Sequence, residues 1–65
     1  MIEMKRLSFE GIENRIGETI TVVYDVSGRL ITYKQKLVAT DSEHLIFQED
    51  KGKSYLSKNR IQNYN

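Results

Sequence analysis

The only histidine of the chain, His44, stands close to two carboxylates, Asp41 and Glu43. Imidazole and carboxylate groups are the usual components of acid–base sites and of metal sites. The spacing argues against both, because Asp-x-Glu-His is not typical of metal ligands and adjacent residues of a strand point to opposite faces. We therefore expect His44 to be an exposed residue at a strand edge, without a metal and without a catalytic role.

The other residue constellations that enzymes use are missing from the sequence. Cysteine is absent, and the four glycines, Gly11, Gly17, Gly28 and Gly52, are too far apart to form a phosphate-binding loop. We therefore expect a non-enzymatic protein with no catalytic residue and no cofactor.

Aromatic and basic residues in the second half of the chain are of the types that bind single-stranded RNA. A base stacked on an aromatic ring contributes about 1–3 kcal/mol, and cations contact the phosphates. Tyr24, Tyr33 and Phe47 alternate with polar residues, so we expect them in the core. Tyr55 and Tyr64 are the expected exposed pair. The candidate RNA-binding residues are His44, Tyr55, Lys58 and Arg60.

Length and composition predict a single small domain spanning residues 1–65. A domain of this size buries only about 60% of the surface of its unfolded chain, and no disulfide can support so thin a core. We therefore predict a homo-oligomer.

The net charge of +1 excludes the strongly basic class of nucleic-acid binders and leaves only a local basic patch. No apolar run approaches the roughly 18 residues of a membrane span, which favours a cytoplasmic protein without membrane contact.

Two long strands joined by a turn organise the predicted fold. Thr19–Val26 alternates apolar and polar residues at the period of a strand, and Ser27-Gly28 predicts a tight turn. Arg29–Thr40 then carries apolar residues on both faces and a polar middle, as in a bent strand that serves both halves of a small barrel. The alternative is two strands broken near Lys34–Lys36.

A short helix over Phe9–Ile16 is predicted before the first strand. Ser8 is a suitable N-cap, and Gly17 suits the left-handed residue that ends a helix. Met1–Arg6 is either a further short strand or a frayed end.

Three shorter strands are predicted after the long ones, over His44–Gln48, Tyr55–Leu56 and Ile61–Tyr64. Glu49–Lys53 forms a hairpin tip between the first two, and Ser57–Arg60 forms a single tight turn before the last. One short helix followed by five strands predicts a mainly β fold, a small five-stranded SH3-like barrel with a short N-terminal helix.

The order of motifs between Gly17 and Tyr64 carries a family resemblance. It runs through a glycine, an alternating strand, a glycine hairpin tip, a strand ending in Leu-x-x-x-Asp and an apolar strand, which are Gly17, Ile20–Tyr24, Ser27–Arg29, Leu37–Asp41 and Leu45–Phe47. With the later segment Tyr55–Ile61, this order resembles the Sm-like family, the ring-forming RNA-binding barrels that include the bacterial RNA chaperones. The resemblance implies a five-stranded Sm-like barrel, a homo-oligomer and RNA as the partner. It places His44 where a base often stacks and Lys58 at a matching lysine, whereas Leu45 stands where Sm proteins carry an asparagine.

A second function fits the same fold. An open barrel leaves edge strands, and the last strand, Ile61–Tyr64, carries no proline that would prevent pairing with another copy or another protein. The alternative prediction is therefore an SH3-like protein–protein interaction adaptor with no role in nucleic-acid binding.

Overall fold

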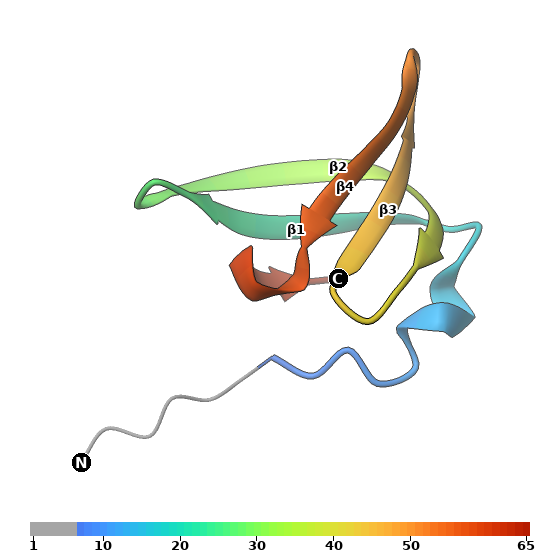
Figure 1. Cartoon of the computed structure of the whole chain (residues 1–65), viewed down its shortest axis with the longest axis horizontal. Coiled ribbons are helices and arrows are strands. Elements are labelled where there is room, and N and C mark those ends of the chain that lie inside the picture. Colours follow the sequence, from blue (N-terminus) through green and yellow to red (C-terminus); the bar gives the residue numbers. More distant parts are fainter. Residues whose placement is uncertain (1–6) are drawn as a thin grey trace.

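A computed structural model describes residues 7–65, so the segment Met1–Arg6, predicted as a strand or a frayed end, lies outside the described residues. Five antiparallel strands form one sheet in the order β4-β3-β2-β1-β5 (Figure 1). The strands are β1(Thr19–Val26), β2(Arg29–Thr40), β3(His44–Glu49), β4(Gly52–Ser57) and β5(Ile61–Tyr64). The prediction of a mainly β fold is confirmed, and within residues 7–65 the sheet is open.

The longest strand, β2, belongs to both halves of the sheet. Its residues Arg29–Lys36 pair with β1, and the remainder, from Lys36 to Thr40, pairs with β3. A bulge between Leu37 and Ala39 inserts an extra residue close to this change of partner. Such a bulge bends a strand and increases its twist. Because β2 is continuous, the alternative of two strands broken near Lys34–Lys36 is wrong.

Two hairpins extend in different directions from the place where β2 changes partner (Figure 1). We call this region, with the buried core residues around Leu37 and the turn before β3, the junction. The turn between β1 and β2 has positive φ at both central residues, 52° at Ser27 and 83° at Gly28, which is the backbone of the predicted tight turn. β3 and β4 meet at a second turn, which is followed by Gly52 with a φ of 141°. We call the projecting end of the first hairpin, residues 23–32, the arm.

The core lies at the junction of the two hairpins. The alternating residues of β1 supply Ile20 and Val22, as the period of two predicts. Among the expected core aromatics, Phe47 is buried, and Tyr24 and Tyr33 are half-buried against the core with edge-to-face ring contacts. The buried apolar residues are Ile12, Ile20, Val22, Leu37, Leu45, Phe47 and Ile61.

The prediction of a helix over Phe9–Ile16 is wrong. The structure has only a short 3₁₀ turn, η1(Ile12–Arg15), which begins after Gly11 with a φ of +80° and ends at the extended residue Ile16. A left-handed residue interrupts a right-handed helix, so the helix cannot continue across Gly11. The turn instead inserts Ile12 into the core. Among the described residues, no helix has the length and apolar character needed to cross a membrane.

Candidate functional site

A hollow of about 330 Å³ opens beside the end of β4 and the short turn η2(Lys58–Arg60). Three of the four predicted RNA-binding residues, His44, Tyr55 and Arg60, line it together. They come from β3, β4 and η2, which are brought together because β4 pairs along the whole of β3 and leads directly into η2. The full lining is Tyr24, His44, Tyr55, Leu56, Ser57 and Arg60.

The rings of His44 and Tyr55 lie against each other at the rim of this hollow. In the register of β3 and β4, His44 lies opposite Ser57 and Tyr55 lies opposite Ile46, so the two rings are diagonal neighbours on one face of the sheet. Their centroids are 6.2 Å apart and their planes meet at 84°. Tyr55 is 61% exposed, so much of its ring remains accessible to a stacked base.

Asp41 holds His44 in place at the beginning of β3. Its Oδ1 accepts hydrogen bonds from the backbone N–H groups of Glu43, at 2.8 Å, and of His44, at 2.6 Å. The Nδ1 atom of His44 lies 3.3 Å from the same oxygen. These contacts, led by the N–H of Glu43, lower the pKa of Asp41 below its ordinary value of 3.8. The carboxylate therefore acts as the cap of a turn and as an anchor for the imidazole.

Lys58 is the one predicted RNA-binding residue that does not line the hollow. Its Nζ lies 5.4 Å from the centroid of the Phe9 ring, in a cation–π arrangement. Phe9 is in turn stacked on Tyr64, with the ring centroids 5.4 Å apart, and the Tyr64 hydroxyl donates a hydrogen bond to the carbonyl of Ser8 at 3.0 Å. The expectation that Tyr64 is exposed is wrong, because this stack leaves the residue half-buried.

Sequence reasoning missed the part played by Tyr24 in the hollow. Tyr24 is half-buried against the core and also lines the hollow. A bulge in the pairing of β1 with β5 falls between Val23 and Tyr24, where the register shifts toward Ile61. Such a bulge depends on the pairing of two distant strands, so no local pattern of residues could have indicated it.

Asp41, Glu43 and His44 form a turn that the Asp41 carboxylate caps. Among residues 7–65, no cluster of three or more His, Asp or Glu side chains is placed to hold a metal ion. The arrangement of the hollow suits non-covalent binding, since it offers two tyrosine rings, an imidazole and a guanidinium on one concave surface.

No protein-family model, no curated protein and no solved structure matches this chain. The resemblance to the Sm-like family therefore stays a prediction, and the function is argued from the geometry of the hollow.

Proposed function

We propose that this protein is a small, non-enzymatic, cytoplasmic module that binds single-stranded RNA in the hollow and self-associates. The observation that carries the proposal is the gathering of an exposed aromatic ring, Tyr55, with His44 and Arg60 around one space of about 330 Å³. Aromatic rings bind unpaired bases of any sequence, and a guanidinium forms charge-assisted hydrogen bonds with phosphate.

Each residue of the proposed site has a distinct role. A base stacks on Tyr55, while His44, anchored by Asp41, packs against the edge of the same platform. Arg60 contacts the neighbouring phosphate. Lys58 supplies a second cation from the same turn, and it exchanges its contact with Phe9 for a phosphate when the strand is bound. Only two cations, Arg60 and Lys58, contact phosphates in this site, so few counterions are released and the salt dependence of the affinity is shallow.

In the proposed binding module, the open sheet is curved into an SH3-like or Sm-like barrel. β4 and β5 are the two terminal strands of the sheet, and the three-residue turn η2 connects them directly. Their adjoining ends, Ser57 and Ile61, are therefore held near each other at the place where a five-stranded barrel would close.

Binding of a labelled oligouridine of about ten nucleotides, followed by fluorescence anisotropy, tests the proposal. This length falls within the site sizes of about 4–16 nucleotides that small β modules bind. We expect Tyr55→Ala to weaken binding about 5- to 150-fold, as the loss of one stacked base requires, and Tyr55→Phe to keep most of the affinity. Absence of binding by the unmodified protein, or equal losses in the two Tyr55 variants, would contradict the proposal.

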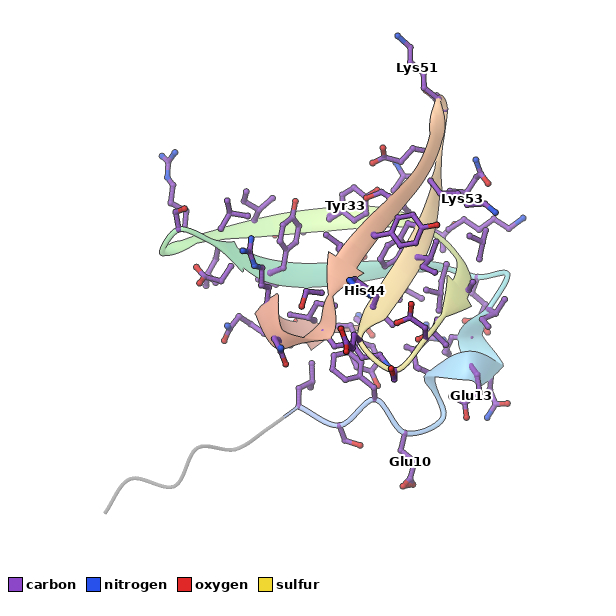
Figure 2. All side chains as sticks on the ribbon, in the orientation of Figure 1. Glu10, Glu13, Tyr33, His44, Lys51 and Lys53 are labelled. Atoms are coloured by element: carbon purple, nitrogen blue, oxygen red, sulfur yellow. The ribbon has the colours of Figure 1, made fainter. Side chains whose placement is uncertain are left out.

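A matched pair of charge reversals distinguishes RNA binding in the hollow from non-specific electrostatic binding of RNA elsewhere on the protein. Arg60→Glu should weaken binding strongly, whereas Lys51→Glu makes the same charge change at the tip of the β3–β4 hairpin, far from His44 (Figure 2). Equal losses in the two variants would mean that the RNA is attracted by net charge alone and does not occupy the hollow.

The second candidate function is a protein–protein interaction adaptor that uses strand addition. It is favoured by the position of β4 and β5 at the two ends of the sheet order and by the exposed residues Gln62 and Asn63 on β5. An unmodified protein that binds no RNA would remove the first proposal and leave this one.

A further inference from the structure

Besides the outer edges of the terminal strands β4 and β5, one inner strand among the described residues, β2, is unpaired on one side along part of its length. Along Arg29–Gln35, β2 pairs with β1 on one side, whereas β3 joins the other side only from Lys36 onward. Beyond Gln48 the β3–β4 hairpin rises away from β2, as Figure 1 shows. Within residues 7–65, no strand therefore pairs with this seven-residue edge of β2 through its backbone, although the Tyr33 side chain reaches Phe47 and Glu49 of β3.

The pairing of β2 with β1 determines which backbone groups on this edge are available. Leu37 directs both its N–H and its C=O toward the segment before β1, through bonds with Glu18 at 2.9 Å and Gly17 at 2.7 Å. In an antiparallel ladder these directions alternate, and the register from Lys36 to Arg29 contains no bulge. The N–H and C=O groups of Leu30, Thr32 and Lys34 therefore point away from β1 and can pair with a further strand.

The open edge is complementary to itself. A second copy placed antiparallel about a two-fold axis at Thr32 sets Leu30 opposite Lys34 and Ile31 opposite Tyr33 of the second copy. No two like charges face each other, and the Ile31–Tyr33 pairs are of the aromatic and β-branched type that stabilises sheets. All three outward residues of each copy find backbone partners in this register.

The same edge carries the exposed apolar residues of the arm. Leu30 is 65% exposed and Ile31 is 39% exposed, although both belong to a strand. A natural sheet usually protects an edge of this kind with charge, a proline or a covering element. Here the stretch carries two charges, Arg29 at its end and Lys34 inside it, and in the symmetric register they lie opposite Gln35 and Leu30 of the second copy.

We infer that two copies of this chain pair through the β2 edge, Arg29–Gln35, and form a two-fold dimer with one continuous sheet. This inference does not depend on the hollow or on RNA binding. It assigns the self-association to β2, away from the terminal strands β4 and β5, and so differs from pairing through the last strand.

Two variants of Leu30 that differ only in charge test the pairing. Within its own hairpin Leu30 lies opposite Asp25, so a lysine at this position is favourable and a glutamate unfavourable in the monomer. Across the proposed interface the preference is reversed, because residue 30 lies opposite Lys34 of the second copy, where a glutamate is favourable and a lysine unfavourable. The two-fold axis repeats the contact, so we expect the dissociation constant of the Leu30→Glu dimer to be at least about tenfold lower than that of Leu30→Lys.

Sedimentation equilibrium over micromolar to millimolar concentrations measures this difference, and circular dichroism confirms that both variants are folded. A monomeric unmodified protein throughout that range, equal dimerisation of the two variants, or tighter association of Leu30→Lys would each overturn the inference. The RNA titration of the same proteins reports separately on the hollow.

Cysteine cross-linking locates the axis, since the chain has no cysteine of its own. At the centre of the register two copies of residue 32 lie with Cα atoms about 5.5 Å apart, within the range for a disulfide. We expect Thr32→Cys to give a covalent dimer on mild oxidation and the control Gln62→Cys, on exposed β5, to give little. Preferential cross-linking of Gln62→Cys would show that the copies meet at β5 and would overturn the assignment to β2.

Discussion

The junction and the arm are built from the same two strands, yet their apolar residues have opposite fates. At the junction, Ile20 of β1 is 1% exposed and Leu37 of β2 is 0% exposed, whereas Leu30 and Ile31 of the arm are 65% and 39% exposed. The strands alternate in the same way in both places, so alternation alone does not create a core. At the junction, side chains from β3, β5 and η1 join those of β1 and β2 in one core cluster, and apolar burial requires such partners from other elements.

The largest expected difference between the two regions is in the cost of truncating a side chain. Phe47→Ala at the junction should lower the free energy of unfolding by about 3–5 kcal/mol, which equals the whole stability expected from one core of this size. Leu30→Ala on the arm should change it by no more than about 0.5 kcal/mol, because the side chain is already exposed. Circular dichroism without denaturant shows whether Phe47→Ala still folds, and urea denaturation measures Leu30→Ala against the unmodified protein, at a concentration where the protein is monomeric. A comparable cost at Leu30 would contradict the division into junction and arm.

The turn η1, which packs on the junction, provides a second comparison. Here the predicted helix and the observed turn require changes of opposite sign in the free energy of unfolding of Gly11→Ala. Inside a helix, Gly11→Ala would raise the free energy of unfolding by about 1 kcal/mol. At the observed φ of +80°, the same change should lower it by about 1–2 kcal/mol, although an added Cβ meets its nearest neighbour only at 3.9 Å. Gly28→Ala, at a φ of +83° in the turn of the arm, is the matched control for backbone strain without a core residue attached.

A larger loss of stability in Gly11→Ala than in Gly28→Ala would show that Gly11 also positions Ile12 in the core. A gain of stability in Gly11→Ala would restore the predicted helix and contradict the structure described above. Thermal unfolding of the two variants is sufficient to decide between these outcomes.

Local signals predict most of the sheet. The alternation of Thr19–Val26 and the pair Ser27-Gly28 specify a strand and its turn within a few residues, and both are present. Gly11 misled the prediction because glycine is compatible both with a costly place inside a helix and with a left-handed residue. The choice between them is made by the docking of Ile12 on strands that lie far along the chain, which no local pattern contains.

The contacts of the candidate site also divide into those that local sequence determines and those that depend on distant parts of the chain. His44 and Tyr55 come from paired strands of one hairpin, so their contact follows from a register of short range. The position of Lys58 depends on Phe9 and Tyr64, which are separated by most of the chain and meet only in the folded protein. The contact of His44 with Tyr55 could therefore be predicted from the hairpin, whereas the contact of Lys58 with Phe9 could not.

The smallest expected effect concerns the polar turn of the junction and its response to acid. Hydrogen bonds from Glu43 and His44 lower the pKa of Asp41, so the folded state favours the ionised carboxylate. Its contribution to stability is complete above the unfolded pKa, near the ordinary value of 3.8, and is lost as the pH falls through the lower folded value. Asp41→Asn should therefore lower the melting temperature slightly at neutral pH and make the acid limb of the melting curve shallower.

The control for this change is Asp25→Asn, which removes one carboxylate from the arm and leaves the turn at Asp41 intact. Melting temperatures of both variants between about pH 2 and pH 7 span the titration of carboxylates. If the junction carries the acid response, only Asp41→Asn brings the difference between variant and unmodified protein toward zero as the pH falls. If Asp25→Asn flattens the acid limb as much, the response belongs to the net charge of the molecule, and the turn at Asp41 is no more sensitive than the arm.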